Sequence, residues 1–138
     1  QLMTSAGRIL EIYVYHKLQE SGFDDVVSGY EINWGDTDVK SEFDCIVTSG
    51  FKCAMIECKA QDKISQDYYY KLSCLAKQFG INAIPVLIAD THEREDWDNS
   101  TNEMQRERGK MMGVVTVYDR DDISNIDMTL RRILNGKY

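Results

Sequence analysis

The sequence predicts an α/β fold in which a mixed β-sheet carries helices on both faces. Three observations support this fold class. Two apolar strands flank a Gly50-Phe51 turn within 41–59, a continuous apolar run covers 83–89, and helical patterns precede and separate these segments. A meander of strands followed by helix-strand crossovers combines antiparallel with parallel pairing, and the crossover helices cover both faces of the sheet. The expected order is α-β-β-β-α-β followed by α-β-α.

The first element is a helix over 4–19. Leu10, Val14 and Leu18 recur at helical spacing and form one apolar stripe, and Gly22 lies beyond the end of the helix. This stripe is expected to pack against the sheet.

The remaining elements follow from hydrophobic periodicity and from capping signals. We expect strands over 26–34, 83–89 and 113–118, a polar turn over 35–40, helices over 68–79 and 102–112, and a last helix through Leu134 that Ser124 and Asp127 cap and Gly136 closes. The inner face of the helix over 68–79 should hold Tyr68, Leu72, Leu75, Ala76 and Phe79. Pro85 cannot donate a ladder hydrogen bond, so we place it at the first residues of its strand or at a bulge.

Length and hydropathy indicate one domain, 1–138, with one core. The chain starts at Gln1 rather than Met and its first helical pattern begins almost at once, so we expect a domain cut from a longer protein. It has no run of roughly 18 apolar residues and no signal-peptide pattern. We therefore expect a cytoplasmic domain without a membrane partner.

The formal net charge of −7 argues against adhesion to nucleic acid through bulk positive charge. The excess is local, because seven acidic residues stand against two arginines over 90–107. A carboxylate-rich metal centre would also be partly neutralised by its ions. Net charge therefore does not exclude a nucleic-acid substrate, and the acidic segment is most simply a solvated loop.

The four cysteines do not form a recognisable metal motif. Cys45, Cys53, Cys58 and Cys74 lack the paired spacing of a zinc site, and neither histidine lies near them in sequence. We expect small buried hydrophobic residues, and nothing indicates an oxidising compartment.

The Gly50-Phe51 turn sets the register of the hairpin. A two-residue type II′ turn favours Gly first, where φ is positive, and it pairs positions whose numbers add up to the same sum. Asp44 then lies across from Glu57, with Glu42 across from Lys59.

Alternation along the hairpin places three charged side chains on one face. Asp44, Glu57 and Lys59 share this face with Ile46 and Met55, which indicates that the face is buried. Two carboxylates beside a lysine at the end of an apolar hairpin are typical of a metal site.

These residue types suit phosphodiester hydrolysis, which needs an activated water and charge stabilisation in the transition state. Mg²⁺ or Mn²⁺ prefers hard oxygen ligands, which Asp44, Glu57 and the backbone carbonyl of Cys58 can supply. The ammonium of Lys59 can hold or deprotonate the attacking water and counter the growing phosphate charge.

Glu11 lies inside the buried arc of the first helix. A carboxylate there is costly unless it is paired or binds a metal. We expect Glu11 to point at the same ion site or at Lys59, or else to bond a buried tyrosine or backbone group.

Substrate contacts are expected from the helix over 68–79. Lys71 and Gln78 lie beside its apolar stripe and suit a phosphate or the attacking water, although both can equally be exposed helix positions. Tyr70 and its two tyrosine neighbours can stack on unpaired bases or divide between core and surface.

These motifs resemble a known family. An aspartate followed by Glu-x-Lys at a strand end, with a glutamate on the preceding helix, resembles the PD-(D/E)XK superfamily of restriction endonuclease-like nucleases. The nuclease domain of CARF-domain CRISPR accessory proteins is similar in the segments GRILEIYVY (7–15), SEFD (41–44), IECKA (56–60) and YKL (70–72). The resemblance covers most of the chain, although Phe43 stands where the superfamily often has Pro.

The resemblance implies a metal-dependent nuclease that cuts DNA, RNA or both and works as a homodimer. It implies that Asp44 and Glu57 are metal ligands, that Lys59 is the catalytic lysine, and that Glu11 is a supporting acid. It also implies that an upstream CARF domain, absent from this chain, senses cyclic oligoadenylate.

Two other interpretations stay open. The charged cluster of the hairpin can be an ordinary cross-strand ion pair, in which case the domain would be a nuclease-fold module for nucleic-acid binding or assembly without catalysis. A small-molecule α/β enzyme fits less well, because the chain has no Gly-rich phosphate loop and no evident Ser-His or Cys-His arrangement.

Overall fold

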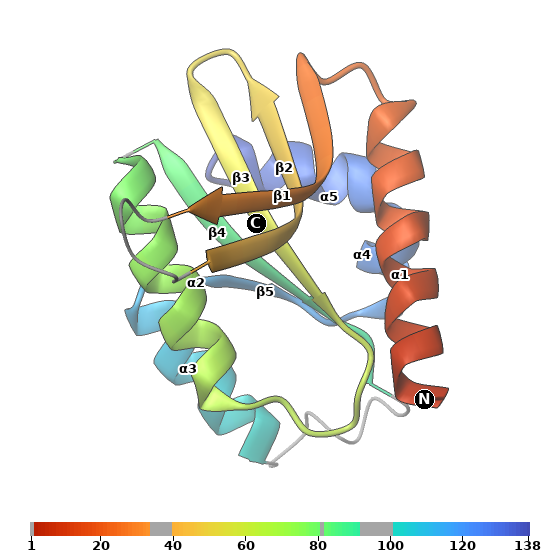
Figure 1. The fold of residues 1–138 in the computed structure, drawn as a ribbon, viewed down its shortest axis with the longest axis vertical. Coiled ribbons are helices and arrows are strands. Elements are labelled where there is room, and N and C mark those ends of the chain that lie inside the picture. Colours follow the sequence, from red (N-terminus) through yellow and green to blue (C-terminus); the bar gives the residue numbers. More distant parts are fainter. Residues whose placement is uncertain (1, 34–39, 81, 92–100) are drawn as a thin grey trace.

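A computed structural model of the chain confirms the α/β class and describes residues 2–33, 40–80, 82–91 and 101–138 (Figure 1). In chain order its elements are α1 (Leu2–Gln19), β1 (Asp25–Asn33), β2 (Lys40–Ser49), β3 (Lys52–Lys59), α2 (Gln66–Phe79), β4 (Ala83–Ala89), α3 (Thr101–Met111), β5 (Val115–Val117), α4 (Arg120–Ser124) and α5 (Ile126–Leu134). This is the expected order, with the short α4 added.

The strands form a five-stranded mixed sheet in the order β1-β2-β3-β4-β5. The pairs β1–β2 and β2–β3 are antiparallel, and β3–β4 and β4–β5 are parallel. One core lies between the sheet and α1 with α5, and a second lies between the sheet and α2. The expectation of a single core is therefore wrong, because the sheet separates two. Helices therefore cover both faces, as the sequence predicts (Figure 1).

Two local predictions on this framework are confirmed. Leu10, Val14 and Leu18 are buried against the sheet. The turn between β2 and β3 has Gly50 at φ 61°, in the left-handed region that favours glycine. The ladder pairs Ser49 with Lys52 and continues to the Cys45–Ile56 pair in the predicted register.

Pro85 lies at the third position of β4, opposite Met55 of β3. The partner strand on the other side, β5, joins only from Val86 onward. The segment around Pro85 is thus an edge on that side, which is where a strand tolerates a residue without an N–H.

The end of the chain differs from the prediction. The last helix begins at Ile126 after Asn125, and Ser124 instead ends α4, which Asp119 caps by accepting a hydrogen bond from the backbone N–H of Asp121. Asp119 is therefore the N-cap of an additional helix, which begins before the predicted cap Ser124. Strand β5 is also shorter than predicted, because the chain after α3 turns at Gly113 with φ 84°.

Several smaller predictions change as well. Cys74 is exposed rather than buried, whereas Cys45 and Cys58 are buried as expected. On α2 the fully buried tyrosine is Tyr69 rather than Tyr68, and Phe79 is 44% exposed.

Two sequence predictions fall wholly or partly outside the described residues. These are the polar turn over 35–40, of which only position 40 is described, and the part of the acidic segment over 92–100. The last part of that segment lies in α3, in agreement with the helix predicted over 102–112. In the described part of the chain, every helix is too short or too polar to cross a bilayer.

The contact between α3 and α2 depends on a glycine. Gly109 is buried, and a methyl group at its Cα would overlap the ring of Tyr69. That ring is fully buried, and its hydroxyl shares a 2.9 Å hydrogen bond with the Thr116 hydroxyl, so the ring is held in place.

Replacement of this glycine should destabilise the domain. We expect Gly109→Ala to lower the free energy of unfolding by about 2 kcal/mol, because the overlap outweighs the better helix propensity of Ala. Thermal denaturation measures the effect, with Lys110→Ala at the next, exposed position as a control that should change stability by less than about 0.5 kcal/mol. A Gly109→Ala variant as stable as the parent would contradict the packing described for α3.

Candidate active site

The sheet divides at Asp44. The β2–β3 ladder ends at the Cys45–Ile56 pair, whereas β3 continues beside β4 as far as Lys59. Strand β2 stays paired with β1 beyond this point, and the part of this pair that lies farther from the β2–β3 turn bends away from β3 toward α2 (Figure 1). We call the place where β2 separates from β3, at Asp44 and Cys58, the fork.

A glycine in β1 accompanies this bend. Gly29 lies between Ser28 and Tyr30, the partners of Cys45 and Phe43 in β2. Its φ of 62° is in the left-handed region, where a side chain would be strained. The alternation of faces also breaks here, because Phe43 and Cys45 pack in different cores.

The fork holds the Asp44 carboxylate. The backbone N–H of Cys58 donates a 2.7 Å hydrogen bond to Asp44 Oδ2. This N–H points toward β2 and meets a carboxylate in place of a strand carbonyl, because the ladder has already ended. The predicted pairing of Asp44 opposite Glu57 therefore lies just past the last ladder pair, and the two residues meet across the fork instead.

Glu57 lies on the α2 side of the sheet and is only 7% exposed. Its Oε1 is 3.6 Å from Lys59 Nζ, and its Oε2 is 4.0 Å from Lys71 Nζ. In the described part of the chain Oε2 is buried without a hydrogen-bond partner. The pKa of Glu57 is raised to about 7, chiefly by burial and also by the negative charge of Asp44, while the two lysines offset part of the rise.

Lys59 is held by an aromatic ring that sequence reasoning did not connect with it. Its Nζ lies 4.5 Å from the centroid of the Tyr68 ring, at cation–π distance. Gln61 fixes that ring, since its side-chain amide donates to the Tyr68 hydroxyl at 3.0 Å and to the Lys63 carbonyl at 2.8 Å. The sequence signal for this contact was Tyr68 itself, an aromatic residue in the first turn of the helix that follows the strand ending at Lys59.

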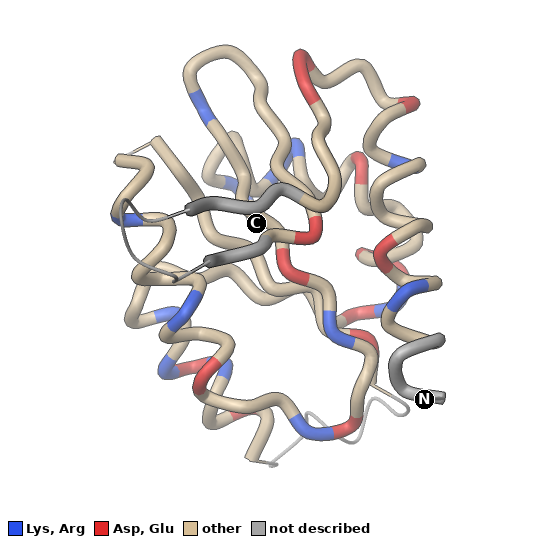
Figure 2. The backbone as a smooth tube through the Cα atoms, in the orientation of Figure 1, with Lys and Arg blue, Asp and Glu red and all other residues tan. Residues whose placement is uncertain are grey.

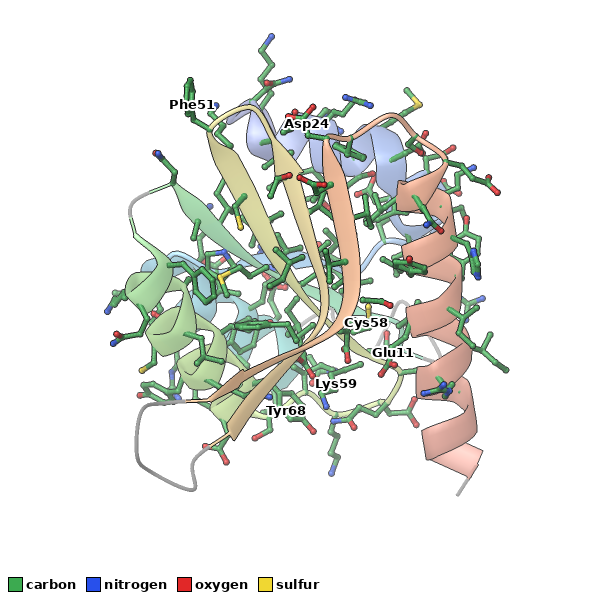
Figure 3. The ribbon with its side chains drawn as sticks, turned by 45° about the horizontal axis from the view of Figure 1, so that its top comes forward. Glu11, Asp24, Phe51, Cys58, Lys59 and Tyr68 are labelled. Carbon is green, nitrogen blue, oxygen red and sulfur yellow. The ribbon has the colours of Figure 1, made fainter. Side chains whose placement is uncertain are left out.

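Glu11 reaches the fork from the other side. Helix α1 covers the face that carries Cys45 and Cys58, opposite the face of Glu57. Glu11 is half-buried, and its negative charge contributes to the raised pKa of the Cys58 thiol, after burial and nearer charges. Glu11 thus lies on the opposite side of the sheet from the Glu57 side chain, and it points toward the fork (Figure 3).

Two adjoining hollows lie between α1 and the fork. One of about 350 Å³ is lined by Gly7, Arg8, Glu11, Cys58, Lys59, Ala60 and Gln61. The other, of about 220 Å³, is lined by Arg8, Glu11, Ile12, Tyr15, His16, Ser28, Gly29 and Asp44. Arg8 and Glu11 line both, and Arg8 was not among the predicted site residues. Figure 2 shows acidic and basic positions interspersed around this end of β3.

The predicted substrate contacts of α2 separate in space. Lys71 pairs with Glu57, whereas Tyr70 is 55% exposed. Gln78 is exposed two helical turns beyond Lys71, or about 10 Å along the axis. Lys71 is thus the residue of this predicted set that reaches the carboxylates.

The donors at the fork fit a divalent cation. In the described ranges no three His, Cys, Asp or Glu side chains are placed together to hold a metal ion. The donors at the fork are two carboxylates, Asp44 and Glu57, and the backbone carbonyl of Cys58. This set of hard oxygens, with one buried carboxylate oxygen lacking a hydrogen bond, fits Mg²⁺ or Mn²⁺.

The fold and the Asp…Glu-x-Lys site define the class of the protein. A mixed sheet with helices on both faces, an aspartate at a strand bend and Glu57-Cys58-Lys59 at the end of the next strand characterise a PD-(D/E)XK nuclease with the restriction endonuclease-like fold. The chain belongs to the family of Card1-like endonuclease domains, which it matches over residues 2–132. It is therefore a domain of an endonuclease family.

Solved structures agree on the fold. Protein VC1899 from Vibrio cholerae matches with a TM-score of 0.73 at 18% identity, over 95% of this chain and 34% of that protein. Can2 from Sulfobacillus thermosulfidooxidans, solved with cyclic tetra-adenylate, matches with a TM-score of 0.69 at 19% identity, over 94% of this chain and 36% of Can2. The small subunit of the heterodimeric restriction endonuclease R.BspD6I matches with a TM-score of 0.50 at 13% identity, over 93% of this chain and 77% of that subunit.

The chain spans about a third of the length of VC1899 and of Can2. No sequence among curated proteins matches it.

The buried carboxylate should cost stability at high pH. The pKa of Glu57 is about 7 in the folded state against 4.5 ordinarily, so the folded state binds the proton more tightly and its stability falls as pH rises through this interval. In a chelator, Glu57→Gln should raise the Tm at pH 8 by about 3 °C or more, with a smaller difference at pH 5.

Glu103→Gln is the matched control. A hydrogen bond from Arg106 lowers the pKa of Glu103, so its ionised form is favoured in the fold and the substitution should give no gain in Tm at pH 8. A parent protein more stable than Glu57→Gln at pH 8 would contradict the burial of an ionised Glu57.

Proposed function

We propose that this domain is a metal-dependent endonuclease that hydrolyses phosphodiester bonds in DNA, RNA or both. The observation that carries the proposal is the buried Glu57 Oε2, which has no hydrogen bond among the described residues and whose pKa the charge of Asp44 raises. Such an oxygen is costly unless a cation binds it. Asp44, Glu57 and the carbonyl of Cys58 would hold one Mg²⁺ or Mn²⁺, with Glu11 as a supporting acid on the α1 side.

A bound cation would supply Lewis-acid stabilisation of the phosphate and lower the pKa of a coordinated water. The residues of the chain do the rest. The hydrogen bond from Cys58 N–H fixes the orientation of Asp44. Lys59, 3.6 Å from Glu57 and held over Tyr68, orients the attacking water and counters the charge that grows on the phosphate. Lys71 adds a second positive charge on the α2 side.

We propose further that the domain is the effector part of a longer CRISPR-associated defence nuclease that works as a homodimer. Can2 is a nuclease-fold relative solved with cyclic tetra-adenylate, and the present chain corresponds to 36% of it. Regulation by a cyclic oligoadenylate would reach this domain through a sensor domain elsewhere in the longer protein. Residues 1–138 would form one catalytic domain of that assembly.

Cleavage should depend on the fork. We expect the protein to cut plasmid DNA, single-stranded RNA or both in Mg²⁺ or Mn²⁺, and to lose the activity in a chelator. Asp44→Asn, which keeps an acceptor for the Cys58 N–H, and Lys59→Ala should each lower the cleavage rate by roughly 10²-fold or more. Phe51→Leu, at the exposed tip of the β2–β3 turn, is the control and should leave the rate unchanged. Cleavage that survives both site substitutions would refute the assignment.

Metal binding should also appear as stability. A cation that binds the folded state alone raises the free energy of unfolding by about 2.7 kcal/mol at a hundredfold excess over its Kd. Mn²⁺ should therefore raise the Tm of the parent protein, and the rise should be lost in a variant that combines Asp44→Asn with Glu57→Gln. A parent protein with no shift in either metal would favour a binding or assembly module without catalysis.

A further inference from the structure

Gly7 lies inside α1, where a glycine is less favourable than alanine. A helical glycine is commonly explained by close packing, and Gly109 is such a case, since a Cβ there would overlap Tyr69. At Gly7 the space is open, because a Cβ would meet no heavy atom of the described residues within 4 Å. Its φ is not in the left-handed region either. Within the described residues, neither packing nor backbone conformation therefore requires a glycine at position 7.

Gly7 lies beside the hollow that opens toward Lys59. Gly7 precedes Val14 by two helical turns and Glu11 by one, so it continues the sheet-facing stripe of α1. Val14 packs against the sheet, whereas Gly7 lies where this stripe passes the end of β3 and lines the hollow of about 350 Å³ that Lys59 and Gln61 also line. The glycine therefore widens a hollow that opens directly onto the candidate catalytic lysine.

The charges of this hollow suit a polyanion that also approaches a metal site. Arg8, which is exposed, and Lys59 both line it, so two basic residues border the space. Glu11 faces it as well and would repel an isolated anion. A chain of phosphates can meet the two cations while its sugar passes the carboxylate, which a free phosphate cannot do.

We propose that Gly7 forms the wall of a subsite for the nucleotide next to the scissile phosphate, and that the sugar–phosphate backbone of the substrate strand passes directly against the Cα of Gly7. The inference rests on the proposed function, because it takes a nucleic acid as substrate. Any side chain at position 7 occupies the path of the strand, while α1 itself gains helix propensity.

The test exploits this opposition between stability and binding. Gly7→Ala and Gly7→Leu should both raise the Tm, by about 3 °C for Ala. The KM for nucleic acid should rise several-fold for Ala and roughly tenfold or more for Leu, with a smaller change in kcat. The Mn²⁺-induced rise in Tm should stay at the parent value, because the metal donors are untouched. Ala6→Leu, at the preceding exposed position, is the matched control and should keep the parent KM.

The outcomes separate the subsite from the proposed function. A parent protein that cleaves nucleic acid, with Gly7→Leu at the same KM, would refute the subsite alone. A Gly7→Leu variant that melts below the parent would show a structural role for the glycine and overturn the proposal. A rise in KM that accompanies a change of oligomeric state in size-exclusion chromatography would assign the space to a second copy of the chain. A parent protein without cleavage in any metal would refute the proposed function itself.

Discussion

The separation of β2 from β3 at Asp44 is the constraint on which the site depends. Strand β3 is held by β4 as far as Lys59, so it cannot follow when β2 bends away with β1. The Cys58 N–H then donates a 2.7 Å hydrogen bond to the Asp44 carboxylate in place of a strand carbonyl. Because the β2–β3 ladder ends here, the Cys58 N–H has no strand carbonyl as partner and binds the Asp44 carboxylate, which fixes the position of that acid. Asp44 is placed between the two faces of the sheet, where groups from α1 and α2 can both reach it.

The electrostatics of the fork are unfavourable for a domain that only folds. Glu57 is buried beside a second carboxylate, its Oε2 has no hydrogen bond in the described part of the chain, and burial raises its pKa to about 7. Two lysines stand at 3.6 and 4.0 Å, longer than close ion pairs, so they compensate incompletely. Sites that bind charge at the moment of reaction commonly keep such uncompensated groups at the expense of stability. The open wall at Gly7 follows the same logic, since it gives up helix propensity beside the same residues.

The fold was largely predictable because its signals are local. Gly50 in the turn fixed the hairpin register, and the stripe of α1 fixed which residues are buried. The arrangement of the site was less predictable, since alternation assumes that a ladder continues, and it placed Asp44 and Glu57 on one face. Gly29 in the interior of β1 was the available signal of a bend. Glu11 was assigned to the correct helix face, but a single sequence does not tell which side of the sheet a helix covers. The start of α5 was misplaced because Asp119 caps an additional helix.

The central claim is that the fork is a cation site. Crystals soaked in Mn²⁺ and measured near the manganese absorption edge test it directly, because anomalous difference density locates the ion without reference to activity. The expected result is a peak within coordination distance of the Asp44 and Glu57 carboxylates and the Cys58 carbonyl, with Lys71 displaced from Glu57. A fork that keeps both lysines at Glu57 and shows no peak, at Mn²⁺ concentrations that saturate binding in solution, would contradict the account.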